Sequence, residues 1–292
     1  MKRLVWALPF FFILSACSAL AEQQQPTKHE SLTAPAVAGI SSATQRKLVT
    51  VLLSDTNSNQ LGSGVLVGSA PGGHWVVTNR HVVQDQTSVC VLTFDHHVIP
   101  ALVLSPSKED LLKKLDLAFL WLPNSAKDQL TVAAIALKPV DAGKLPLVIA
   151  TGFPIPLLLR RHGPLYTERP GLLLPLLTKP LQGGFDLAYT AALEKGMSGG
   201  GVFLGSTLIG INGAHAYPLW PGQWQDQRGQ AVSSALNDKL ELVSLGLSTP
   251  TIQEALKLVL VPSAEQMKNL VGLKCRGMKM PAATITTNVT NW

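Results

Sequence analysis

The chain has 292 residues, of which 46% are hydrophobic and 14% are charged. This length suffices for a buried core, and the composition excludes a chain that is disordered along most of its length. The formal net charge is +6, but no run of five or more basic residues occurs, so the sequence gives no support to nucleic-acid binding.

The first segment, residues 1–21, is typical of a secretory signal peptide. A basic start at Lys2 and Arg3 precedes an apolar run at Leu4–Leu14 that is too short to span a bilayer as a stable helix. The sequence therefore predicts an exported protein.

Two cleavage sites lie side by side at the end of this segment. Ala19-Leu20-Ala21 fits ordinary signal peptidase, whereas Leu14-Ser15-Ala16-Cys17 resembles a bacterial lipoprotein box in which Cys17 becomes acylated. The match at all four positions of the box favours a lipid anchor in the cell envelope. A soluble periplasmic or secreted protein is the alternative.

Residues 22–46 are rich in Gln, Pro, Ala and Ser without apolar periodicity, and are interpreted as a linker. Short apolar runs follow, separated by Gly- and Pro-containing turns, which favour an all-β barrel or sandwich over long helices. Strands are expected at Leu48–Leu53, Gly64–Val67, Trp75–Val77, Val98–Leu104, Leu117–Leu122 and Leu147–Ala150, with a hairpin at Phe203–Leu208. Thr251–Leu260 has one apolar face at helical spacing and predicts a single helix near the C-terminus.

Three motifs carry residues capable of chemistry. His81 ends Thr78-Asn79-Arg80-His81-Val82, Asp116 opens the apolar run Asp116-Leu117-Ala118, and Ser198 lies within Gly196-Met197-Ser198-Gly199-Gly200-Gly201. Taken singly, each has an ordinary structural interpretation: a surface histidine, a carboxylate that caps a turn, and a flexible glycine loop. The glycines around Ser198 also allow a tight turn in which the N–H groups of Gly196 and Ser198 converge on one point.

The ordered set of motifs resembles trypsin-like serine peptidases, closest to the bacterial HtrA/Deg-like branch. The resemblance spans roughly residues 47–260 and includes Ile149–Pro154 and Leu208–Asn212. It implies two packed antiparallel β-barrels. Residues 261–292 form a C-terminal extension, shorter than the PDZ module usual in that branch.

The resemblance also implies a role for each residue. Ser198 is the nucleophile, His81 the general base and acid, and Asp116 the group that orients His81. The N–H groups of Gly196 and Ser198 form the oxyanion hole. Ala192 is expected at the floor of the specificity pocket, where the lack of a carboxylate favours a small or apolar substrate residue. The strand edge at Gly213-Ala214-His215 is expected to bind the substrate backbone.

The sequence departs from the family at two positions beside Ser198. Met197 replaces the Asp that serves zymogen activation in the digestive branch, so no switch of that kind is expected. Gly201 replaces the usual Pro, which predicts a loop that needs local ordering before it works. Trp220 and Trp224 lie in a later segment that is suited either to a wall of the cleft or to ordinary packing.

The remaining predictions concern the cysteines, cofactors and competing functions. Cys90 and Cys275 are compatible with a disulfide in an oxidising compartment or with free thiols. No cofactor is expected, and the pair His96-His97 lacks the further ligands of a metal site. An active endopeptidase that acts on proteins or peptides is the leading hypothesis. A catalytically silent trypsin-like peptide-binding protein is the second.

Overall fold

The computed structural model describes residues 40–104, 114–124, 130–155, 165–214 and 222–276. The expected signal peptide, with Cys17, and most of the expected linker lie outside these residues. No helix in the described ranges is long and apolar enough to cross a membrane.

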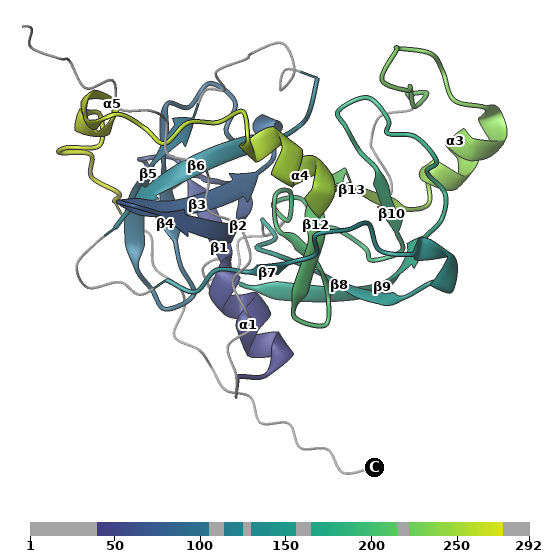
Figure 1. The fold of residues 1–292 in the computed structure, drawn as a ribbon, viewed down its shortest axis with the longest axis horizontal. Coiled ribbons are helices and arrows are strands. Elements are labelled where there is room, and N and C mark those ends of the chain that lie inside the picture. Colours follow the sequence, from purple (N-terminus) through teal and green to yellow (C-terminus); the bar gives the residue numbers. More distant parts are fainter. Residues whose placement is uncertain (1–39, 105–113, 125–129, 156–164, 215–221, 277–292) are drawn as a thin grey trace, which may run out of the picture.

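The first half of the chain forms a closed antiparallel barrel, at the left of Figure 1. Its strands follow the order β1-β2-β3-β6-β5-β4, and β1 closes the barrel by pairing with both β2 and β4. Their inward side chains are almost wholly apolar, and the rings of Trp75 and Trp121 meet edge to face at 4.8 Å between centroids. The bounds are β1 Thr50–Ser54, β2 Gln60–Ala70, β3 Gly73–Thr78, β4 Ser88–Leu92, β5 Val98–Leu104 and β6 Ala118–Pro123.

The second half forms another barrel, at the right of Figure 1. Its order is β11-β8-β9-β10-β13-β12, closed by pairing between β11 and β12, with β7 added in parallel to β12. The expected hairpin is confirmed, since Leu204 pairs with Thr207 around a Gly-Ser turn. The bounds are β7 Ala134–Ile135, β8 Leu147–Gly152, β9 Thr167–Leu174, β10 Leu187–Tyr189, β11 Gly201–Leu204, β12 Thr207–Ala214 and β13 Ser244–Ser248. Two packed antiparallel barrels were the predicted fold class, which is confirmed.

The prediction of one helix was too low, because four α-helices occur within the described ranges. The expected one is α4, which covers Thr249–Leu256 and buries Ile252, Ala255 and Leu256. It starts earlier than predicted because Pro250 lies inside its first turn, where a missing N–H costs nothing. The others are α1 Ser42–Val49, α3 Ser234–Leu240 and α5 Ala264–Lys268, with 3-10 turns at Arg80–Val82 and Ala142–Lys144. At five to eight residues, they are too short to show a clear helical period.

Helix α1 occupies the place where the sequence predicted the end of a linker and the start of a strand. Arg46 is mostly buried and donates to both carboxylate oxygens of Glu168 on β9, at 3.1 and 2.8 Å, and to the carbonyl of Gly205 at 2.7 Å. Burial disfavours the Glu168 carboxylate, but hydrogen bonds from Arg46 and Tyr166 prevail and lower its pKa. The helix preceding the first barrel is thereby attached to the second (Figure 1).

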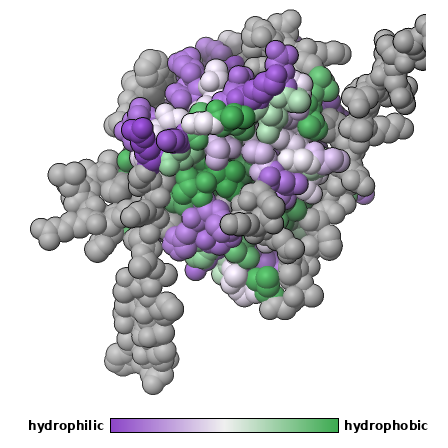
Figure 2. Space-filling model, turned by 90° about the vertical axis from the view of Figure 1, so that its left-hand side faces the viewer, coloured by the Kyte–Doolittle hydropathy of each residue, from purple (hydrophilic) through white to green (hydrophobic). Residues whose placement is uncertain are grey.

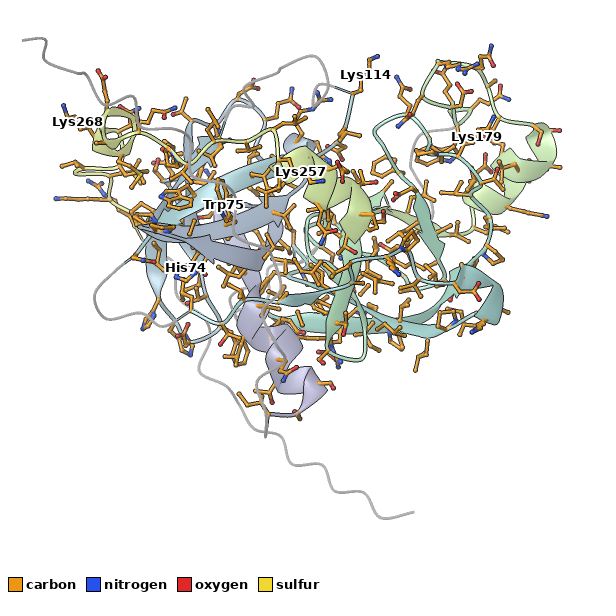
Figure 3. The ribbon with its side chains drawn as sticks, viewed as in Figure 1. His74, Trp75, Lys114, Lys179, Lys257 and Lys268 are labelled. Atoms are coloured by element: carbon orange, nitrogen blue, oxygen red, sulfur yellow. A yellow bond between two sulfur atoms is a disulfide. The ribbon has the colours of Figure 1, made fainter. Side chains whose placement is uncertain are left out.

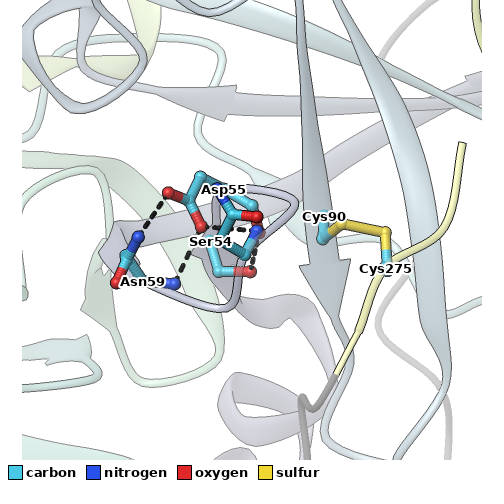
Figure 4. The surroundings of a disulfide bond; sticks show 6 residues. Ser54, Asp55, Asn59, Cys90 and Cys275 are labelled. Atoms are coloured by element: carbon cyan, nitrogen blue, oxygen red, sulfur yellow. Dashed lines mark hydrogen bonds between the residues drawn. A yellow bond between two sulfur atoms is a disulfide. The ribbon is translucent and has the colours of Figure 1, made fainter.

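The C-terminal part of the described chain returns to the first barrel. Cys90 on β4 and Cys275 form a disulfide between residues 185 positions apart, with Cα atoms separated by 5.7 Å (Figure 4). Leu270, just after α5, is buried in the main core cluster. Figure 2, which faces this end of the molecule, shows an apolar area bordered by hydrophilic side chains. Of the two interpretations left open for the cysteines, the disulfide is the one found.

Candidate active site

His81 and Asp116 are joined by two hydrogen bonds at one end of the first barrel. The chain leaves β3, and a 3-10 turn over Arg80–Val82 brings the backbone and the ring of His81 to the same carboxylate. The His81 N–H donates to Asp116 Oδ1 at 3.0 Å, and His81 Nδ1 lies 2.7 Å from Asp116 Oδ2. The side chain of Asp116 is 14% exposed and that of His81 is 48% exposed. This carboxylate therefore holds Nδ1 as the protonated nitrogen, leaving Nε2 to accept a proton.

The backbone around Asp116 is fixed by the second barrel as well as by the first. Its N–H donates to the carbonyl of Gly183 at 2.8 Å, and its own carbonyl accepts from the amide group of Asn79 at 3.0 Å. Leu115 forms a parallel bridge with Gly183. The His81–Asp116 pair therefore lies where the two barrels meet.

Ser198 lies in the loop between β10 and β11, and Ser63 on β2 holds that loop. The Ser63 N–H donates to the carbonyl of Ser198 at 2.9 Å, and its hydroxyl donates to the carbonyl of Gly196 at 2.7 Å. The Ser198 hydroxyl lies 3.5 Å from the carbonyl of Gly213. No hydrogen bond joins Ser198 to His81 in the described structure. The Ser198 loop and the His81–Asp116 pair therefore lie at the same junction, but their side chains are not hydrogen-bonded to each other.

The N–H groups expected to form an oxyanion hole belong to Gly196 and Ser198. Gly196 has φ +96°, and an added Cβ would lie 2.6 Å from the carbonyl oxygen of Phe153, so only glycine fits here. Neither N–H donates a hydrogen bond to any residue in the described ranges. Two backbone donors two residues apart in a rigid turn are suited to stabilising an oxyanion.

Asn212 is a further support of this loop. Its buried amide group donates to the carbonyls of Met197 and Thr151 at 3.0 and 2.8 Å, and its Oδ1 accepts from Tyr189 at 2.8 Å. Its backbone carbonyl accepts from Gly199 at 3.0 Å. Asn212 and Thr151 lie in the segments that carry the family resemblance, but only the fold shows what they contact. Nothing in the sequence singled out Ser63.

We expect Ser63→Ala to lower turnover and the free energy of unfolding together. Its hydroxyl also accepts from the N–H of Phe153 at 2.9 Å, so the substitution leaves this donor and the Gly196 carbonyl unpaired. Each buried group left unpaired costs about 1–3 kcal/mol. Urea unfolding and peptide hydrolysis would measure the two effects, with Ser69→Ala, a mostly exposed position at the far end of the same strand, as the matched control. Unchanged values for both quantities would contradict this role.

Gly201, in place of the family's proline, has a structural reason. It opens β11, and its N–H donates to the Thr151 hydroxyl at 3.1 Å, a bond that proline cannot make. An added Cβ would lie 2.2 Å from the ring of Phe203. The expectation of a loop in need of ordering is not met at this residue, because its backbone is part of a strand.

The residues expected to bind substrate lie at the ends of two strands or outside the described ranges. Ala192 is exposed beyond the end of β10, while Gly213 and Ala214 end β12. His215 lies outside the described residues. Met197, beside Ser198, is fully buried.

A cavity of about 670 Å³ opens beside His81 and Asp116. Trp224 forms part of its wall and packs edge to face against Phe185 at 6.3 Å between centroids, so this tryptophan serves both of the uses predicted for it. Phe185 also lines the cavity, and the other lining residues are Arg80, Lys114, Gln182, Gly183, Gly222, Gln223, Gln225 and Gln227. Within the described ranges, no cluster of three or more His, Cys, Asp or Glu residues is arranged to hold a metal ion.

The fold is that of a trypsin-like peptidase. The family model for the trypsin-like peptidase domain matches residues 62–211, just over half of the 292 residues, and the chain belongs to this family of serine peptidases. No curated protein matches the chain.

Solved structures similar to this chain include two of the Rv3671c protease. One is its inactive form, which is 18% identical with a TM-score of 0.48, over 77% of this chain and 95% of that chain. The other is an inactive serine-to-alanine mutant from M. tuberculosis H37Rv, 19% identical with a TM-score of 0.49, over 77% of this chain and 92% of that chain.

Proposed function

We propose that this chain is an exported serine endopeptidase that hydrolyses peptide bonds with Ser198, His81 and Asp116. The observation that carries the proposal is the double hydrogen bond between His81 and Asp116, at the junction that also holds the Ser198 loop. Family membership supplies the reaction class. The sequence motifs name the candidate for each role, and the hydrogen bonds between His81 and Asp116 support two of them.

In the proposed reaction, Ser198 Oγ attacks the scissile carbonyl carbon while His81 Nε2 takes the hydroxyl proton. The carbonyl oxygen becomes an oxyanion and accepts from the N–H groups of Gly196 and Ser198. As the peptide C–N bond breaks, His81 gives its proton to the leaving amine, and an acyl-enzyme remains. Water then attacks the ester, with His81 again accepting and returning the proton.

The contact between Ser198 and His81 forms when substrate binds. The Ser198 hydroxyl lies 3.5 Å from the Gly213 carbonyl, a weak interaction that a rotation of the side chain breaks. Catalytic hydrogen bonds are commonly loose in free enzymes and shorten in the substrate complex. Since Met197 is buried and offers no carboxylate, no ion pair with a new N-terminus is required.

A catalytically silent peptide-binding protein is the second candidate, favoured by the missing hydrogen bond between Ser198 and His81. A fluorophosphonate probe separates the two, because it reacts only with an activated serine. We expect the purified full-length protein to be labelled at Ser198. An unlabelled protein, alongside an active serine peptidase as positive control, would favour the silent binding protein.

We further propose that the chain is held at the cell envelope through acylated Cys17. The four-residue lipoprotein box supports this anchor. Incorporation of labelled palmitate that disappears in Cys17→Ala would test it. Equal incorporation in both proteins, or none in either, would count against it and favour cleavage after Ala21.

A further inference from the structure

Among the described residues that line the cavity beside His81, basic side chains outnumber acidic ones. Arg80 and Lys114 are its cationic residues, and Asp116 is the one carboxylate in its described lining. Both oxygens of Asp116 already interact with His81. The carboxylate in the described lining is therefore engaged by His81.

One further carboxylate lies close by, at Asp226 between two of the lining glutamines. Hydrogen bonds to it from the N–H groups of Gln230 and Arg228 measure 3.0 and 2.8 Å. These bonds, with the charges of Arg228 and Lys179, lower the pKa of Asp226. Asp226 therefore has basic neighbours of its own, and it forms no ion pair with Lys114.

Lys114 is the cation best placed to act on a bound peptide. It is exposed, and no carboxylate in the described ranges forms an ion pair with it. Its backbone position is set by the next residue, Leu115, which is bridged to Gly183. Figure 3 shows Lys114 at the upper edge of the molecule, with Lys179 across from it on the second barrel.

We infer that this cavity binds a glutamate or aspartate side chain of the substrate, near the scissile bond. The inference rests on the proposed function, since it places the scissile bond at Ser198 and His81. A side chain in a cavity lined by His81 belongs to a residue within a few positions of that bond. Its methylene groups pack on Trp224 and Phe185, and its carboxylate meets Lys114.

The test uses purified full-length protein and internally quenched peptides. A library of random peptides first defines a cleaved sequence, and matched peptides then carry Glu or Gln at each of the four positions on either side of the cleaved bond. We expect kcat/KM to favour Glu about fivefold at one position, the upper range for an exposed charge pair. The preference should decrease as salt concentration rises.

Substitutions connect the preference to the cavity. The Glu/Gln ratio should fall to about one in Lys114→Gln and reverse in Lys114→Glu, whereas Lys268→Gln removes the same charge from exposed α5 and should keep the wild-type ratio. The ratio compares two substrates of the same enzyme, so a loss of folded protein does not change it.

Fluorophosphonate labelling of the wild type distinguishes the two ways of failing. Labelled protein with no Glu preference, or with one that Lys114→Gln leaves intact, would overturn the acidic subsite alone. Wild-type protein that neither labels nor cleaves would overturn the peptidase proposal and the subsite with it.

Discussion

We expect Ser198→Ala to lower kcat for peptide hydrolysis by about a million-fold, the loss found when the nucleophile of such a triad is removed. Methyl replaces hydroxyl, so no acyl-enzyme forms, and His81 has no proton to take. Among the described residues, the side-chain hydrogen bond lost is the 3.5 Å contact with Gly213, so stability should hardly change. Hydrolysis of casein and of a quenched peptide, with thermal unfolding in parallel, would measure both quantities.

Ser206→Ala is the matched control, because this serine lies in the hairpin turn between β11 and β12. It should keep wild-type turnover and labelling by the fluorophosphonate probe. A Ser198→Ala protein that still cleaved casein at the wild-type rate would contradict the assignment of Ser198 as the nucleophile.

Much of the architecture was predictable because it depends on short local patterns in the sequence. Short apolar runs between turns predicted β1, β2, β3, β5, β6, β8 and the β11–β12 hairpin, whereas β4, β7, β9, β10 and β13 were not predicted. The apolar face of residues 251–260 predicted the region of α4. The motifs around His81, Asp116 and Ser198 were recognisable because each is a short run of neighbouring residues. A pattern of this kind can be read without knowing which strands pair.

The supports of the site were not predictable, because they depend on contacts between distant parts of the chain. Ser63 and Gly196 are 133 positions apart, and Arg46 and Glu168 are 122 apart. Nothing in the local sequence distinguishes a serine within a β-strand or an arginine after a polar segment from other residues of that kind. Their partners become known only when the packing of the two barrels is known. Gly201 is a further example. It departs from the family pattern, and only the fold shows that its N–H is needed to donate to the Thr151 hydroxyl.

The second large effect is expected for Asp116→Asn, which should lower kcat by roughly ten-thousand-fold with little change in fold. An asparagine presents one oxygen and one NH₂ group where the carboxylate presents two acceptors. If the asparagine oxygen accepts from the backbone N–H of His81, the asparagine NH₂ group faces Nδ1 of the ring. Nδ1 must then accept a hydrogen bond from this NH₂ group. The proton moves to Nε2, and His81 can no longer take a proton from Ser198.

The matched control is Asp141→Asn, which makes the same substitution at an exposed carboxylate that caps a 3-10 turn. Steady-state hydrolysis at constant pH gives the rates, and nitrogen NMR of the histidine rings reports the tautomer of His81. An Asp116→Asn protein within tenfold of wild-type turnover would show that the carboxylate does not orient the base. Conversely, a change of the His81 tautomer together with the predicted loss of rate would mean that the contact between His81 and Asp116 serves catalysis. A catalytically silent binding protein has no hydrolysis rate that the substitution could lower.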